Sequence, residues 1–296
     1  MSNPIENATS ESFGTNFIVQ ESALDLEFTL PGTLARLRQE TPTLKEQYNS
    51  GKPFPHLVID GLFPEHALSR IVHEFPREDQ CEWLTWHTKN EQKKTSRGTA
   101  GVSIFTQLFC FWLNSTEFIE QIKQITGIDD LVPDPTFFGA GLHEMGRDGW
   151  LNLHADYTQH PIMPLTRRVN LLIYLNHDWE LSWGGDLVLQ DPIKAQQRAS
   201  YPPLFNCTII FPTTTETLHG VPQPLSCPMD RSRKLISIYY WSPIASKMRV
   251  GSPIIWSKNN QARNRVSWTG QKLVKFSAWK FGLEHMVKKS QKPQRK

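Results

Sequence analysis

Residues 136–156 read TFFGAGLHEMGRDGWLNLHAD, two runs rich in apolar and aromatic residues that are separated by the turn signal GRDG. Short strands at regular spacing are typical of a β-sandwich or barrel. Because the chain has neither a βαβ alternation nor a phosphate-binding glycine loop, the pattern predicts a mainly β core. Five further runs of the same kind follow: RRVNLLIYLN (167–176), GGDLVLQD (184–191), NCTIIFP (206–212), ETLHGV (216–221) and RKLISIYYWS (233–242).

Helices are predicted outside this core. One begins just after Pro64 and carries an apolar face, and another spans 114–127, with Asn114 or Ser115 as its cap and Gly127 as its stop. Residues 32–51 predict one or two helices interrupted at Pro42. The polar run NEQKKTSRGTAG, residues 90 to 101, predicts a loop that could close over the opening of the barrel as a lid.

The composition is that of a globular protein with a sizeable core, with 39% hydrophobic and 21% charged residues. No apolar run approaches the about 20 residues that span a bilayer, and the N-terminus lacks a signal-peptide pattern. We therefore expect no membrane partner. The cysteines lack CxxC spacing and are expected to be reduced thiols in a cytoplasmic protein: Cys81, Cys110, Cys207 and Cys227.

The C-terminal part of the chain is strongly basic. Residues 258–296 hold eleven Lys or Arg against one acid, Glu284. Aromatic residues between these charges are too few to indicate base stacking, so we expect no nucleic-acid partner. Apolar residues recur at helical spacing and predict a helix packed on the barrel: Leu273, Phe276, Leu283 and Val287.

The run WLNLHAD places His154 and Asp156 two residues apart, so on a strand both side chains point to one face. Such a pair alone could be a buried hydrogen-bonded couple. A second histidine, His219, follows a strong apolar strand. Two His and one carboxylate form the facial set that suits non-haem Fe(II) and leaves positions open for a co-substrate and O₂. Zinc hydrolases can use the same ligand types, so the residues alone leave the metal open.

Arg231 and Arg233 stand at the start of the last predicted strand. An arginine near such an iron site offers a bidentate clamp for a carboxylate, as the distal end of 2-oxoglutarate would require. A surface salt bridge is the alternative for either arginine.

These motifs together are specific. The set HAD…RRVNLLIYLN…WGGDLVLQD…TLHGV…RSRKLISIYYWS closely resembles the Fe(II)/2-oxoglutarate-dependent dioxygenases of the prolyl-4-hydroxylase-like superfamily, most strongly their bacterial branch. The resemblance covers roughly residues 53–245. It implies a double-stranded β-helix, the jelly-roll core shared with cupins, with flanking helices, and it implies Fe(II), 2-oxoglutarate and O₂ as cofactor and co-substrates.

The resemblance also assigns site residues. His154, Asp156 and His219 match the iron ligands, and Arg233 matches the clamp for 2-oxoglutarate, with Arg231 as its substitute. Tyr174 and Ser237 are expected to support the same carboxylate. Many relatives have a serine where this chain has Leu235, so the support of the carboxylate departs from the family pattern there. No catalytic residue is expected beyond the iron site, and Asp156 argues against a halogenase, which lacks that acid.

Three segments are expected along the chain: an N-terminal extension over 1–52, partly disordered; the oxygenase domain over 53–245, with its β-helix from about residue 136; and the basic extension over 246–296. Substrate residues are less constrained. The sequence places Trp150 just before the metal-binding strand, and it places His160, Arg167 and Arg168 in or beside the loop that follows it.

Arginines near the mouth of the pocket favour a small carboxylate-bearing substrate, such as an amino acid or a natural-product intermediate. Hydroxylation is the default reaction, with desaturation or radical cyclisation as other fates of the same oxidation. The alternatives are a peptidyl (prolyl-type) hydroxylase and, from another class, a non-catalytic cupin-like binding module. Nothing in the sequence indicates the oligomeric state.

Overall fold

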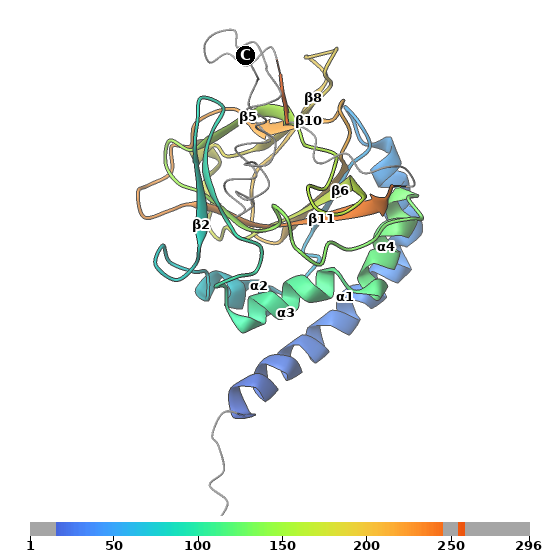
Figure 1. Cartoon of the computed structure of the whole chain (residues 1–296), viewed down its shortest axis with the longest axis vertical. Coiled ribbons are helices and arrows are strands. Elements are labelled where there is room, and N and C mark those ends of the chain that lie inside the picture. The colour runs from blue at the N-terminus through green and yellow to red at the C-terminus, as the bar shows by residue number, and fades with distance from the viewer. Residues whose placement is uncertain (1–15, 245–253, 258–296) are drawn as a thin grey trace, which may run out of the picture.

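The computed structural model describes residues 16–244 and 254–257, with side chains from residue 31 onward. The described chain forms one curled antiparallel sheet with helices packed along one side of it (Figure 1). The basic C-terminal helix predicted from the sequence and the polar residues 1–15 lie outside the described residues. No helix among the described residues is long and apolar enough to cross a membrane.

The elements, in chain order, are α1 Asn16–Ser50, β1 Leu57–Asp60, α2 Glu65–His73, β2 Trp83–His87, β3 Glu91–Ser96, α3 Ile104–Leu113, α4 Thr116–Thr126, β4 Gly141–Met145, β5 Trp150–Ala155, β6 Leu165–Tyr174, η1 Leu181–Trp183, β7 Leu187–Gln190, β8 Arg198–Tyr201, β9 Cys207–Pro212, β10 Leu218–Val221, β11 Arg233–Pro243 and β12 Ile255–Trp256. Hydrogen-bonded strands follow the order β1-β9-β6-β11-β4-β3-β5-β10-β7-β8, with β2 beside β3 and β12 beside β5. The predicted jelly-roll fold with flanking helices is confirmed.

Strands distant in the sequence meet in this sheet and bring the candidate ligands together. In the pairing of β5 with β10, His154 lies directly opposite His219. On the other side, β11 pairs with both β4 and β6, so Arg233 begins a strand in the middle of the sheet. Apolar side chains of β6, β11 and the helices form the main core, so the strands that carry the polar groups are held on a packed support.

The helix caps follow from local sequence. Ser115 accepts a hydrogen bond from the backbone N–H of Phe118 at the start of α4, and Gly127 ends that helix in the left-handed conformation. The helix α2 begins at Glu65, as predicted. The apolar helix α3 was not predicted. Its inner face buries Phe105, Phe109, Cys110 and Leu113.

Two predictions about local structure are wrong. Pro42 does not interrupt the N-terminal helix, because α1 continues from Asn16 to Ser50 with both Pro31 and Pro42 inside it. Buried side chains on either side of Pro42, those of Leu37 and Leu44, pack in the main core and outweigh the local cost of the proline. The predicted loop over 90–101 contains the strand β3, which pairs with β2, β4 and β5 and is part of the barrel wall rather than a separate lid.

Candidate metal and co-substrate site

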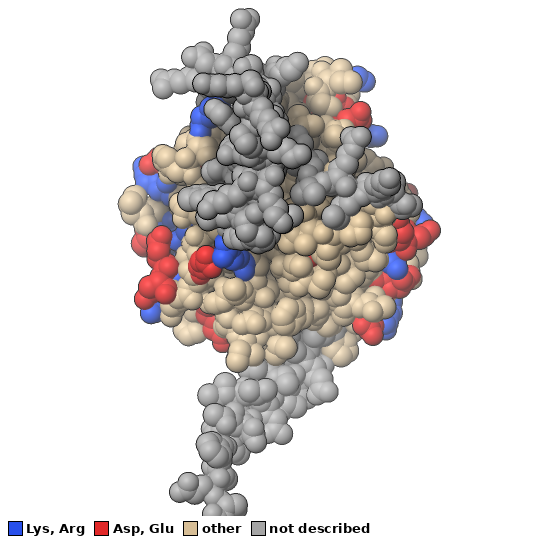
Figure 2. Space-filling model, in the orientation of Figure 1, with Lys and Arg blue, Asp and Glu red and all other residues tan. Residues whose placement is uncertain are grey.

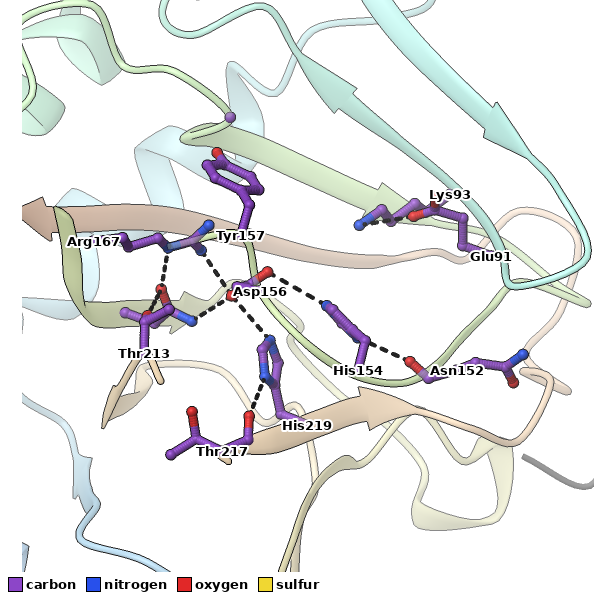
Figure 3. Close-up of polar contacts among 12 residues, drawn as sticks. Glu91, Lys93, Asn152, His154, Asp156, Tyr157, Arg167, Thr213, Thr217 and His219 are labelled. Carbon is purple, nitrogen blue, oxygen red and sulfur yellow. Dashed lines mark hydrogen bonds and ion pairs between the residues drawn. The ribbon is translucent and has the colours of Figure 1, made fainter. Parts of the chain in front are cut away.

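His154, Asp156 and His219 converge in the barrel interior, each offering a ligand atom within 4.8 Å of the others. His154 Nε2 lies 3.5 Å from Asp156 Oδ1, and His219 Nε2 lies 3.4 Å from Asp156 Oδ2. All three side chains are buried. Figure 3 shows both imidazole rings directed at the carboxylate. Among the described residues this is the one group of His, Cys, Asp or Glu with such an arrangement.

Hydrogen bonds at the far side of each ring decide which nitrogen is free. The Nδ1 atom of His154 lies 2.9 Å from the Asn152 carbonyl oxygen, and Nδ1 of His219 lies 3.4 Å from that of Thr217. A carbonyl only accepts, so Nδ1 carries a proton in both rings, and in a neutral ring Nε2 is then the nitrogen with the lone pair. Two such lone pairs and a carboxylate facing one another repel unless a cation lies among them. The donor set therefore fits a bound metal ion.

The charge states agree with this arrangement. Burial lowers the pKa of His219 to about 3, against the opposing effect of Asp156, so the ring is neutral at pH 7. Burial alone would raise the pKa of Asp156, but the Arg167 guanidinium and the two histidines outweigh it and hold that pKa well below its usual value. The neutral imidazole of His219 and the ionised carboxylate of Asp156 are protonation states that metal ligation requires.

A second layer of residues fixes the Asp156 carboxylate. Arg167 lies 3.0 Å from Oδ2, and the Asn170 amide donates to the same oxygen at 2.9 Å. The Asn170 oxygen in turn accepts from Arg167 Nε and from the Thr213 hydroxyl. The guanidinium of Arg167 also lies 3.3 Å from the centre of the Tyr239 ring. This network leaves Oδ1 as the less restrained oxygen.

Arg233 and its neighbours line the same cavity, which has a volume of about 70 Å³, several times the roughly 10–15 Å³ that one water needs. Arg233 Nε donates to the Gly185 carbonyl at 2.7 Å, and an Nη2 hydrogen is donated to the Tyr174 hydroxyl at 3.0 Å. Burial raises the pKa of Tyr174 to about 12, with Arg233 opposing, so the phenol stays protonated. Its own O–H and the remaining guanidinium donors are free to bind a carboxylate.

Ser237 gives independent support for a ligand at this place. Its hydroxyl is buried and has no hydrogen-bond partner among the described residues, although a polar group in that position normally has one. Ser237 lies four residues beyond Arg233 on β11, on the same face of the strand, and both line the cavity. A carboxylate held by Arg233 would satisfy the serine as well.

Gly185 is required by this geometry. Its φ of +88° is in the region that favours glycine, and a Cβ built there would lie 3.2 Å from Cδ of Arg233 and 3.3 Å from the Trp179 ring. The absence of a side chain lets the backbone carbonyl approach Arg233, so the WGG turn of the sequence positions the clamp.

The other predicted residues are in different places. Arg231 bonds to the carbonyls of His177 and Asp178 and is not among the residues that line the cavity. His160 also differs from its prediction as a substrate residue: it is fully buried, its Nε2 lies 3.3 Å from Asp134 Oδ2, and it does not line the cavity. Its ring helps to order the loop that follows β5, since Nδ1 accepts from the backbone N–H of Met163.

Trp150, Arg167 and Arg168 also lie in different places. Trp150 is half-buried at the start of β5, opposite Gln92 of β3, and does not line the cavity. Arg168 is on the outer side, 3.8 Å from Asp130 and 3.3 Å from the Ser242 hydroxyl. Of the four predicted substrate residues, the structure brings only Arg167 into the cavity.

Sequence reasoning missed several residues of the site. Asn170 could have been noticed as a polar residue inside an otherwise apolar strand. Lys93 and His143 carried no signal, because one is in a polar run and the other is in the strand before the HxD motif. Leu235, the departure from the family pattern, lines the cavity between Arg233 and Ser237.

Comparison with known proteins agrees with this geometry. Residues 140–242 match the family model of the 2OG-Fe(II) oxygenase superfamily. No curated protein matches the chain. The structure is similar to a prolyl hydroxylase from Trichoplax adhaerens, solved in complex with an oxygen degradation domain peptide of hypoxia inducible factor, with a TM-score of 0.54 and 15% identity over 71% of this chain and 92% of that one.

Two further similar structures have lower TM-scores. A prolyl-4-hydroxylase of Pseudomonas putida has 17% identity over 69% of this chain and 100% of that one, with a TM-score of 0.47. One of the prolyl 4-hydroxylases of Phytophthora capsici has 18% identity over 84% and 75%, with a TM-score of 0.48. The sequence match, which spans the strands that carry the candidate ligands, is the finding that identifies the domain. Residues 140–242 are therefore a domain of the 2OG-Fe(II) oxygenase superfamily, and the chain is an enzyme that uses Fe(II), 2-oxoglutarate and O₂.

Proposed function

We propose that this oxygenase oxidises an unactivated C–H bond of a small carboxylate-bearing metabolite, such as an amino acid or a natural-product intermediate, with hydroxylation as the outcome. His154, Asp156 and His219 would hold the iron, and Arg233, Tyr174 and Ser237 would hold 2-oxoglutarate. One observation carries the proposal: the same cavity is lined by the three-ligand set, by Arg233 and by Ser237, whose hydroxyl has no partner among the described residues.

The bound ferrous ion, together with 2-oxoglutarate and O₂, would supply the oxidation of the C–H bond. The protein's own residues supply geometry. The carbonyls of Asn152 and Thr217 hold the rings of His154 and His219 with Nε2 directed at the site. With three protein ligands, a bound metal would keep positions open for the co-substrates.

The clamp for the distal carboxylate of 2-oxoglutarate combines charge and neutral donors. Arg233 is held by Gly185 and Tyr174, so its guanidinium pays little entropy on binding a carboxylate. The Tyr174 phenol and the Ser237 hydroxyl would each donate one further hydrogen bond. Apolar side chains line the cavity around these groups and limit its water, which strengthens the electrostatic interactions inside it: Leu172, Leu187, Phe211, Val221 and Leu235.

A peptidyl hydroxylase is the second candidate. It rests on the fold similarity to a prolyl hydroxylase that was solved with a peptide. At 15% identity this similarity carries the fold alone, and the three cations that line the cavity, Lys93, Arg167 and Arg233, favour a small acid. The cytoplasmic location expected from the cysteines, which are all buried and unpaired, stays a prediction.

The test is an anaerobic titration of the metal-free protein with Fe(II) and then with 2-oxoglutarate. A 2-oxoglutarate chelated to ferrous iron gives a weak visible charge-transfer band. We expect the band in the native protein and in His87→Ala, whose histidine is on the exposed face of β2, and we expect its loss in His154→Ala. A folded native protein that binds Fe(II) but never develops the band on addition of 2-oxoglutarate would contradict the proposed function.

A further inference from the structure

The strand β3 contributes a charged side chain to the cavity that the iron and 2-oxoglutarate sites do not use. Lys93 lines the cavity, and its Nζ lies 3.3 Å from Oε2 of Glu91, two residues earlier on the same face of the strand. The side chain of Lys93 is only 17% exposed. In Figure 3 the pair points inward from β3, while Arg167 approaches Asp156 from the opposite side.

Strand alternation separates Lys93 from the adjacent lysine. Lys94 points to the other face, where its Nζ lies 2.9 Å from Glu144 and 4.9 Å from the centre of the Trp83 ring. Lys94 does not line the cavity. Two neighbouring residues of the same type therefore have different surroundings, one inside the barrel and one outside.

The inner face of the barrel carries an excess of positive charge. Lys93, Arg167 and Arg233 face the cavity, and each contributes to lowering the pKa of the buried His143, after burial itself, to about 3. Glu91 and Asp156 are the two acids that pair with the inward cations. Glu144 also lines the cavity, but its carboxylate is paired with Lys94 and Lys234 and accepts a hydrogen bond from Ser232. Apart from Glu144 and its own lysine partners, three cations against two acids leave one unbalanced positive charge in the cavity.

Binding of the cofactor and co-substrate does not remove this excess. A ferrous ion and the 2-oxoglutarate dianion cancel each other. A primary substrate with one negative charge would balance the cavity, and a neutral substrate would leave a buried charge uncompensated, which is unfavourable in a low-dielectric interior. On the part of the surface that is described in Figure 2, by contrast, Lys and Arg are interspersed with Asp and Glu.

Of the three inward cations, Lys93 is the one able to rearrange for a substrate. Arg167 is held by Asp156, Asn170 and the Tyr239 ring, and Arg233 is held by its own partners. Lys93 has a flexible stem and three ammonium donors, and Glu91 is its one ion-pair partner among the described residues.

We propose that Lys93 is a specificity-determining residue whose ammonium binds the carboxylate of the primary substrate, with Glu91 holding the ammonium in the cavity when no substrate is bound. This inference rests on the proposed function and names the recognition element of that site. It commits to a free carboxylic acid, because an internal residue of a peptide has no backbone carboxylate to offer.

The experiment uses the anaerobic Fe(II)–2-oxoglutarate protein and measures the change in its charge-transfer band on addition of free L-amino acids, their α-amides and a blocked prolyl peptide. We expect at least one acid to perturb the band and its amide to bind about 10- to 100-fold more weakly, the range for a lost charge-assisted hydrogen bond. In Lys93→Met the affinity for the acid should fall by a similar factor, so that the affinities for acid and amide differ by less than about threefold. Lys93→Arg should keep most of the preference for the acid over the amide.

Lys94→Met is the matched control, with the same substitution on the outer face of the same strand. It should bind acids as the native protein does, and the affinity for 2-oxoglutarate should be unchanged in both methionine variants. Absence of the band in the native protein refutes the proposed function itself. If the band forms normally, three results would overturn the role of Lys93 and leave the proposed function standing. These are that no acid perturbs the band, that amides or the blocked peptide bind as well as acids, or that Lys93→Met binds acids with native affinity.

Discussion

Replacing Arg233 by Met tests the 2-oxoglutarate clamp directly. The methionine keeps the apolar stem but removes the guanidinium, which bonds to Gly185 and Tyr174 and faces the cavity. Loss of one partner of a buried, hydrogen-bonded charge pair costs about 2–5 kcal/mol. At 1.4 kcal/mol per tenfold, we expect the Kd for 2-oxoglutarate to rise by about 30-fold to several thousand-fold.

The assay is the anaerobic titration of the Fe(II) protein with 2-oxoglutarate, with calorimetry as a second measure of the same Kd. Arg231→Met is the matched control. Arg231 bonds to backbone carbonyls of the loop before β7, so its loss should change the Kd less than about twofold. Affinity for Fe(II) should stay within about threefold in both variants, because neither arginine contacts His154, Asp156 or His219. A Kd within threefold of native for Arg233→Met, or a larger effect of Arg231→Met, would refute the assignment.

The remaining predictions concern the supports of the site. Asn170→Leu removes the amide that donates to Asp156 and should weaken Fe(II) binding about 10- to 100-fold, as read by metal titration; native affinity would contradict this. Gly185→Ala should lower the free energy of unfolding by about 1–3 kcal/mol and should also weaken 2-oxoglutarate binding, because the added Cβ would crowd Arg233. Gly184 also has a positive φ but has open space around it, so Gly184→Ala should lower the stability alone. Equal effects of the two substitutions on 2-oxoglutarate binding would count against the crowding of Arg233. Burial lowers the pKa of His143 to about 3, so the free energy of unfolding of the metal-free protein should fall as the pH falls from about 6.5 towards 3, by up to about 1.4 kcal/mol per pH unit. Urea unfolding at a series of pH values should show that this free energy depends less steeply on pH in His143→Gln. The same pH dependence in both proteins would exclude His143 as its origin.

The strands of the β-helix could be predicted because apolar residues dominate them on at least one face. In β11, for example, Ile236 and Ile238 pack in the main core while Arg233 and Ser237 face the cavity. The strand β3 could not be predicted in this way. Its run EQKKTS is polar on both faces, since Lys93 lies inside the barrel and Lys94 pairs with Glu144 outside, and a strand without an apolar face has the composition of a loop.

The metal-binding set was accessible from the sequence because its spacing has a geometric consequence. Residues 154 and 156 share a face on any strand, whatever surrounds them. The roles of lone histidines had no such constraint. His160 and His143 are both near the HxD motif, yet one bonds to Asp134 away from the cavity and the other lines the cavity with a lowered pKa. Only the long-range pairing of strands separates the two.

The adjacent arginines of β6 illustrate how a local irregularity redirects a site residue. Tyr174, Leu172 and Asn170 face the interior, so strict alternation along the strand would turn Arg168 inward and Arg167 outward. The pairing with β11 shifts register here: Val169 faces Tyr240, but Arg167 faces the next residue, Trp241. The extra residue, Arg168, has no partner in that ladder, as in a β-bulge, and it points to the outer side. This one-residue shift directs Arg167 at Asp156, so the charge next to the candidate metal ligand depends on a backbone feature that side-chain patterns do not encode.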